Sequence, residues 1–163
     1  MSMIFNADEI LKIAEQIERN GITFYEKVAA RFRGDEKRTL LRLADMERTH
    51  EKVFAGMRRD LSASGEGLTA FDPEGEAGRY LAAFADGKIF NRNEDPAALL
   101  RPNQSVRDIL ELAIGLEKDS VVFYVAIRDT VPKSLGKDRI ERIINEEMEH
   151  IVLLSGMLKT LDG

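Results

Sequence analysis

The amino-acid sequence predicts an all-α protein, an antiparallel four-helix bundle of two helical hairpins joined by a long crossover. Three observations support this prediction. Apolar residues recur every three or four positions along four long segments. Proline is sparse, and one third of the 163 residues are charged, as in helices with one solvated face. Motifs of the first half also return about 100 residues later. The length fits a single domain over 1–163.

The first hairpin is predicted from two adjoining helices. Asn6 and Glu9 form a capping pair ahead of a helix expected over about 7–33. Gly34 suits the left-handed residue that ends a helix, and a second helix is expected over about 35–61. Because the turn between them is so short, the two helices should lie antiparallel and adjacent.

The crossover, about 62–105, is interrupted by glycine and proline. A short amphipathic helix is expected near 76–86 and a further turn at 96–100. An unstructured loop of roughly 40 residues would be unusual in a compact domain. We therefore expect the crossover to pack on the bundle.

The second hairpin repeats the design of the first. Ser105 and Asp108 form a capping arrangement before a helix expected over about 106–130. A turn containing Pro132 and Gly136 leads to the last helix, about 137–161. Three motifs recur in the same order in both halves, namely Glu18-x-x-Gly21-x-x-Phe24-Tyr25 with Glu117-x-x-Ser120-x-x-Phe123-Tyr124, Glu47-x-x-His50 with Glu147-x-x-His150, and Gly56-Met57 with Gly156-Met157.

The repeated Glu-x-x-His motifs contain both histidines of the chain. Positions i and i+3 share a helix face, so each motif presents a carboxylate beside an imidazole, a pair that suits iron, manganese and zinc. Glu18 and Glu117 should reach the same height in the bundle. Burying four carboxylates without cations would be prohibitive. Two divalent ions are therefore predicted, with six ligands: Glu18, Glu47, His50, Glu117, Glu147 and His150.

Two tyrosines lie on the same helix faces as two of these glutamates. Tyr25 and Tyr124 each follow a candidate ligand by seven residues. Either they donate hydrogen bonds to ligand carboxylates, or they are core aromatics whose hydroxyls find another acceptor. Three further glutamates are expected at the surface of the helices, although the first of them could also be an extra ligand: Glu51, Glu15 and Glu146.

Composition excludes several classes of function. The chain has no cysteine, hence no disulfide, thiolate metal site or cysteine nucleophile. Its net charge of -5 argues against a nucleic-acid surface. No signal pattern and no apolar run of membrane-spanning length is present, so no membrane association and a cytoplasmic location are expected.

The six candidate ligands and the two Phe-Tyr pairs resemble the ferritin-like di-iron carboxylate superfamily, and within it the rubrerythrin-type (erythrin) domain, over nearly the whole chain. The resemblance implies that Glu47 and Glu147 bridge two iron ions. It also implies a terminal ligand pair for each ion, Glu18 with His50 and Glu117 with His150, and a homodimer.

The chain departs from rubrerythrin in two ways. Without cysteine it lacks the rubredoxin-like domain, so electrons would come from a separate donor such as a rubredoxin-like protein. Rubrerythrins also tend to place a further glutamate where Ser120 stands here, which moves the site towards the six-ligand ferritin or bacterioferritin type.

Three functions are compatible with these residues. The resemblance favours an oxidoreductase that reduces hydrogen peroxide. A ferroxidase that uses dioxygen and handles or stores iron is the second. The third is a non-enzymatic bundle that holds zinc or another redox-silent metal.

Overall fold

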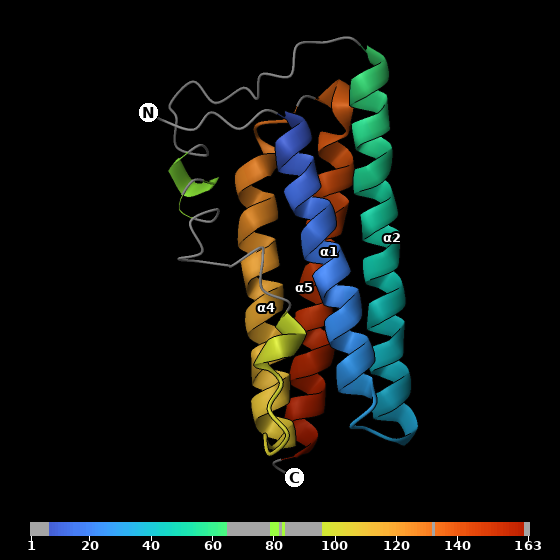
Figure 1. Cartoon of the computed structure of the whole chain (residues 1–163), viewed down its shortest axis with the longest axis vertical. Coiled ribbons are helices and arrows are strands. Elements are labelled where there is room, and N and C mark those ends of the chain that lie inside the picture. Colours follow the sequence, from blue (N-terminus) through green and yellow to red (C-terminus); the bar gives the residue numbers. More distant parts are fainter. Residues whose placement is uncertain (1–6, 65–78, 82, 84–95, 132, 162–163) are drawn as a thin grey trace.

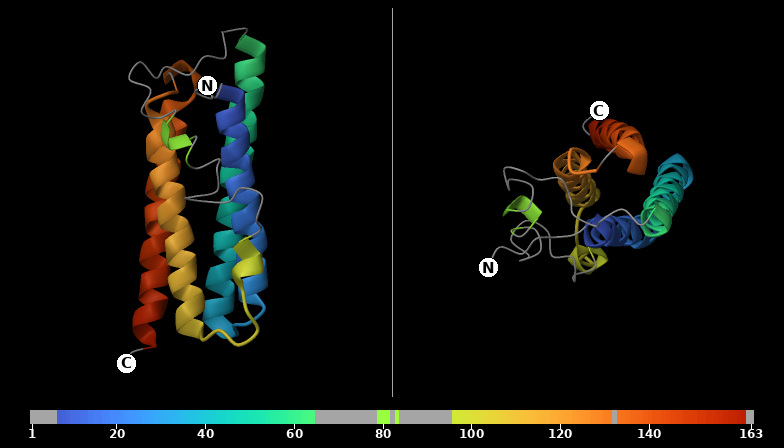
Figure 2. Two further views of the ribbon diagram at one scale, coloured as in Figure 1. Left: turned by 60° about the vertical axis from the view of Figure 1, so that its left-hand side comes forward. Right: turned by 90° about the horizontal axis from the view of Figure 1, so that it is seen from above.

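Four long helices stand side by side in the computed structural model, which describes residues 7–64, 79–81, 83, 96–131 and 133–161 (Figure 1). Seen from above, the four helices stand at the corners of a square: the first has the second and third as neighbours, and the fourth lies diagonally opposite it (Figure 2). This arrangement confirms the predicted helical bundle. The four helices are α1 (Ala7–Ala29), α2 (Gly34–Ser64), α4 (Val106–Arg128) and α5 (Lys137–Thr160).

The turn between α1 and α2 is longer than predicted. Helix α1 ends at Ala29 rather than near residue 33, because the following turn tightens: the amides of Arg31 and Phe32 donate to carbonyls only three residues back, at 2.9 and 3.2 Å. Gly34 has a positive φ of 59°, which glycine adopts without steric cost. Helix α2 therefore begins at Gly34 itself, one residue before the predicted start.

Helix α2 also continues three residues beyond the predicted end at 61. The hydroxyl of Ser62 donates to the carbonyl of Arg58 at 3.0 Å, and that of Ser64 to the carbonyl of Leu61 at 2.8 Å. These bonds supply partners to carbonyls of the last turns. These two serines therefore belong to the helix, although the crossover was expected to begin at residue 62.

The second hairpin starts with the predicted cap. Ser105 Oγ accepts from the amide of Asp108, and the Asp108 carboxylate accepts from the amide of Ser105, both at 3.1 Å. Helix α4 ends at Arg128, two residues early, because both the amide and the hydroxyl of Thr130 bond to the Ile127 carbonyl. The short 3₁₀ helix η2 (Lys133–Leu135) and Gly136, at φ 110°, lead into α5.

Part of the crossover is described. Residues 79–81 and 83 are helical, within the helix predicted near 76–86, whose remainder lies outside the described residues. Leu81 is buried against the bundle. The 3₁₀ helix η1 (Pro96–Leu99) forms at the predicted turn and lies against α1 (Figure 2).

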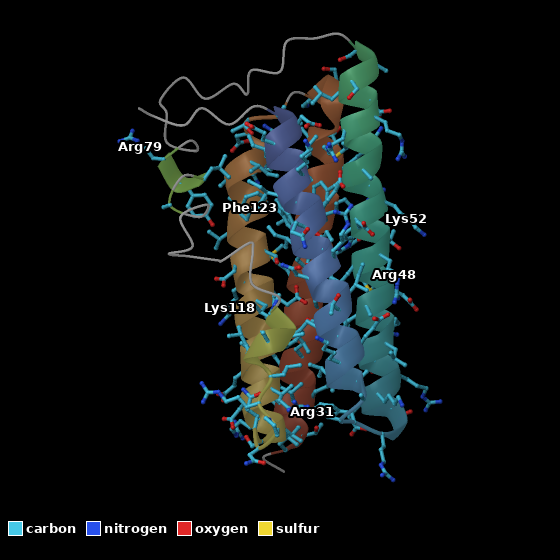
Figure 3. The ribbon with its side chains drawn as sticks, in the orientation of Figure 1. Arg31, Arg48, Lys52, Arg79, Lys118 and Phe123 are labelled. Atoms are coloured by element: carbon cyan, nitrogen blue, oxygen red, sulfur yellow. The ribbon has the colours of Figure 1, made fainter. Side chains whose placement is uncertain are left out.

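The apolar core is divided into two clusters, one above and one below the middle of the bundle. The upper cluster includes Ile10, Phe54, Ile127 and Ile140, and the lower includes Phe24, Leu40, Ile109 and Leu154. Charged side chains such as Arg48, Lys52 and Lys118 point outward (Figure 3). None of the described helices is both long and apolar enough to cross a membrane.

Candidate metal centre

The six predicted ligands meet between the two apolar clusters, at mid-height of the bundle. Each of the four helices contributes: α1 and α4 one glutamate each, α2 and α5 one Glu-x-x-His motif each. All six side chains are buried, with exposed fractions of 4% or less: Glu18, Glu47, His50, Glu117, Glu147 and His150.

These residues form two groups that share two members. Site A consists of Glu18, Glu47, His50 and Glu147, and site B of Glu47, Glu117, Glu147 and His150. Within each group the four candidate ligand atoms lie within 4.8 Å of one another. Each group therefore offers one nitrogen and three oxygens around a single point.

The distances show which oxygen of each shared glutamate faces which site. In site A, His50 Nδ1 lies 2.8 Å from Glu147 Oε1 and 3.6 Å from Glu47 Oε2. In site B, His150 Nδ1 lies 3.2 Å from both Glu147 Oε2 and Glu47 Oε1. Glu47 and Glu147 thus each turn one oxygen towards each site, as bridging carboxylates do. The terminal carboxylates lie close as well, with Glu18 Oε2 3.5 Å from His50 Nδ1 and Glu117 Oε1 3.4 Å from His150 Nδ1.

Several of these atoms lack hydrogen bonds. Among the described residues, Glu18 Oε2, both Glu147 oxygens and Nδ1 of both histidines have no hydrogen-bond partner despite complete burial. The 2.8 Å contact between His50 and Glu147 brings two such atoms together. Buried polar atoms without partners are costly. Two divalent cations would satisfy them, so the donor set fits a di-metal centre.

The terminal and shared glutamates differ in acidity. Burial, and then the charge of a neighbouring glutamate, raises the pKa of Glu18 and of Glu117 well above the ordinary value. For Glu47 and Glu147 burial also acts to raise the pKa, but the close approach of neighbouring groups, His150 among them, lowers it. Without metal, the terminal carboxyls are therefore weaker acids than the shared carboxyls.

The histidines favour the charged form when no metal is bound. Burial alone would lower their pKa, but the carboxylates packed around them raise the pKa of His150 to about 12 and that of His50 further still. A metal ion must displace these protons, because only neutral imidazole is a ligand. Metal binding at this centre is accordingly coupled to proton release.

The two tyrosines cross between the hairpins. The hydroxyl of Tyr25 in α1 donates to Glu117 Oε1 in α4, and that of Tyr124 in α4 donates to Glu18 Oε1 in α1. Each tyrosine thus contacts the terminal carboxylate of the opposite hairpin rather than the glutamate on its own helix. Burial and the adjacent carboxylates raise the pKa of both hydroxyls, which keeps them protonated as donors. The other oxygen of Glu18 stays turned to site A.

Of the three glutamates expected at the surface, one is buried, and another is partly exposed but also contacts the metal centre. Glu146 contacts the metal centre, because its Oε2 lies 2.7 Å from His50 Nε2. Glu15 is buried, with 4% of its surface exposed, since Arg58 and Arg19 pair with it at 2.9 and 3.0 Å. The third, Glu51, pairs with Arg19 at 2.7 Å and is in neither ligand group.

A small cavity of about 30 Å³ adjoins site B between α1 and α4. It has room for about two water molecules. Asn20 is buried here, and its amide Nδ2 has no hydrogen-bond partner among the described residues. The hydroxyl of Ser120 donates to the carbonyl of Leu116 at 3.1 Å, so this position supplies no further carboxylate to the centre. The polar part of the lining consists of Asn20, Tyr25, Glu47, Glu117 and Ser120.

The fold and the donor set together define a four-helix bundle with a buried carboxylate–histidine site for two metal ions. No protein-family model matches the chain, and no curated protein matches it. Among solved structures, the chain is similar to a Thermotoga maritima protein described as a "putative ferritin-like diiron-carboxylate protein", with 27% sequence identity, 95% of each chain covered and a TM-score of 0.75. This similarity supports the ferritin-like di-iron carboxylate superfamily.

Proposed function

We propose that this protein is a di-iron oxidoreductase that reduces hydrogen peroxide with electrons from a separate donor. The observation that supports this proposal most strongly is the shared position of Glu47 and Glu147, each of which turns one oxygen to each of two adjacent sites. Such an arrangement suits two ions held a few ångströms apart, as two-metal sites require.

The reaction needs two electrons and two protons for each peroxide, which becomes two waters. Two ferrous ions, when bound, supply these two electrons at one point. The chain's own part is to hold the ions, to keep bulk water out and to orient the ligands. The bond from Tyr124 fixes Glu18, and that from Tyr25 fixes Glu117.

The size of the cavity supports a small oxidant. A space of about 30 Å³ beside Glu47 and Glu117 admits a molecule of the size of water, peroxide or dioxygen, and is too small for an organic substrate. The amide of Asn20, which has no hydrogen-bond partner among the described residues, could donate to an oxygen atom placed there. Because the chain has no cysteine, we place the reductant in a separate protein or small molecule, such as a rubredoxin-like donor.

A ferroxidase that handles iron is the second candidate, and Ser120 favours it. The hydroxyl of Ser120 is bonded to its own helix, so this position adds no seventh ligand to the centre. A six-ligand set resembles ferritin more than rubrerythrin. Dioxygen would then be the oxidant, and iron the substrate. Manganese or zinc could occupy the same donor set, and with zinc the protein would be redox-silent.

One experiment separates these functions. Protein freed of metal is loaded anaerobically with Fe(II), the bound iron is counted, and the oxidation rate is followed after mixing with peroxide or with dioxygen. Two irons per chain oxidised much faster by peroxide support the peroxidase. Faster oxidation by dioxygen, with uptake beyond two irons, would show a ferroxidase instead. Binding of fewer than two irons, or no oxidation by either, would refute both.

A matched pair of variants provides the control. Glu47→Gln replaces one of the two shared oxygens by an amide NH2, which is no metal ligand, and removes the charge common to both sites, so it should abolish both iron loading and turnover. Glu51→Gln changes a carboxylate one turn further along α2 that pairs with Arg19 and is in neither site. It should leave both properties as in the native protein. Normal turnover by Glu47→Gln would contradict the assignment.

A further inference from the structure

The two histidines of the metal centre differ in the environment of their second ring nitrogen. His50 Nε2 lies 2.7 Å from Glu146 Oε2, a carboxylate that reaches across from α5 to α2. His150 Nε2 is buried too, but it has no hydrogen-bond partner in the part of the chain that the structure describes. Nδ1 of each ring, in contrast, has the same kind of surroundings, since it faces the ligand carboxylates of its own site.

This difference between the two histidines can be traced to one position at which the two halves of the internal repeat have different residues. Glu146 directly precedes the shared ligand Glu147, and the equivalent residue before Glu47 is Met46. A carboxylate accepts a strong hydrogen bond, whereas a thioether is only a weak acceptor. The two halves therefore contribute the same ligands but differ in this supporting group.

A carboxylate behind a ligand histidine has two effects on metal binding. It holds the proton on the outer nitrogen, which leaves the inner nitrogen free to bind the ion, and it makes the imidazole a stronger ligand. Glu146 is placed to do both for His50, because its Oε2 lies 2.7 Å from Nε2 of the ring. At His150, the same tautomer would bury an N–H without an acceptor among the described residues. Loss of such a partner typically lowers metal affinity by about 10–100-fold.

We propose that Glu146 makes the two sites unequal, so that site A binds the first divalent ion tightly and site B binds the second about 10–100-fold more weakly. This proposal rests on the di-metal centre proposed above. The cavity lies on the side of site B, because its lining includes Glu117 of that site besides the shared Glu47. The weaker and more exchangeable ion would therefore lie beside the space that admits small molecules.

A titration with Co(II) alone tests the proposal without any turnover. Metal-free protein is titrated by calorimetry and by visible absorbance. The native chain should bind two ions in two steps whose dissociation constants differ by about 10–100-fold. A crystal grown with one equivalent should show the ion between Glu18 and His50. Two equal steps in the native chain, or a first ion between Glu117 and His150, would overturn the proposal.

Two variants assign the difference to Glu146. Glu146→Gln and Glu146→Met should each weaken the first step by about 10–100-fold and bring it close to the second. Because Glu146 is partly exposed, neither variant places a new group in the core. The control is Glu141→Gln, which changes an exposed glutamate of the same helix and should leave both steps unchanged.

Failure of this inference can be told apart from failure of the proposed function. Two distinct steps that persist unchanged in Glu146→Gln would overturn the role of Glu146 and leave the di-metal centre standing. Binding of no ion, or of one ion only, by the native chain would overturn the di-metal centre and this proposal with it.

Discussion

Gly21 lies in the middle of α1, where its missing side chain makes room for a shared ligand. A Cβ at this position would stand 3.2 Å from Cγ and 3.3 Å from Cδ of Glu47. Those distances are shorter than ordinary van der Waals contacts, so Glu47 would have to shift by a few tenths of an ångström. Gly21→Ala therefore tests how firmly the centre holds Glu47.

Two effects of Gly21→Ala oppose each other. Alanine in a helix interior is favoured over glycine by about 0.8–1.0 kcal/mol. In the metal-free protein Glu47 can move slightly, so the variant should be up to about 1 kcal/mol more stable. With metal bound, both Glu47 oxygens would be held, and the shift should cost about tenfold in affinity, which is about 1.4 kcal/mol. The gain should then disappear or reverse.

Urea unfolding followed by circular dichroism measures this balance, with chelator and with excess Zn(II). Gly156→Ala is the control, because a Cβ there meets nothing within 4 Å. It should stabilise both forms by about 1 kcal/mol. If Gly21→Ala matched Gly156→Ala in the presence of Zn(II), the close contact with Glu47 would be unimportant and the reasoning refuted.

Three further predictions concern the same centre. Tyr124→Phe leaves the buried Glu18 Oε1 without its donor, so urea unfolding should show the metal-free protein destabilised by about 1–3 kcal/mol; an unchanged midpoint would contradict this role. Glu117→Gln should reduce bound Zn(II), measured by elemental analysis, from two ions to one, because Glu117 belongs to site B alone; retention of two would be inconsistent with that division. The pKa of His150 is about 12 in the folded protein and exceeds the value of 6.5 for an ordinary histidine. Protonated His150 therefore stabilises the metal-free fold fully below pH 6.5. This contribution is lost as the pH rises towards 12, by up to about 1.4 kcal/mol per pH unit. Metal affinity should rise over the same range because binding releases protons, and calorimetry between pH 6.5 and 8.5 showing the opposite trend would refute the proton coupling.

The position of the ligands could be predicted from the sequence because two regularities suffice for it. Helical periodicity places Glu47 and His50 on one face, and a short turn sets the height of Glu18 opposite them. The same reasoning holds for the second hairpin. The structure brings all six predicted residues together, and the helix bounds differ by a few residues only at the turns, where individual hydrogen bonds decide.

Contacts between hairpins could not be predicted in this way. Glu146 reaches His50 only because of how α5 is rotated against α2, and periodicity within one helix says nothing about that rotation. Glu15 was expected at the surface because one of the two arginines that pair with it, Arg58, lies 43 residues away in the sequence. Periodicity places the tyrosines on the same helix faces as the ligands. It cannot show that Tyr25 donates to Glu117, because that hydrogen bond depends on how the two hairpins pack against each other.

Each site takes three of its ligands from one hairpin and the fourth from the other. Two identical copies of a single hairpin could therefore assemble the same ligand set around a twofold axis. In such a dimer, however, every substitution appears twice, and the two ions are necessarily equivalent. Joining both hairpins in one chain removes that restriction. A single residue, such as Glu146 at the position where the first half has Met46, can then give one ion a different chemistry from the other. The symmetric scaffold around the two ions is kept.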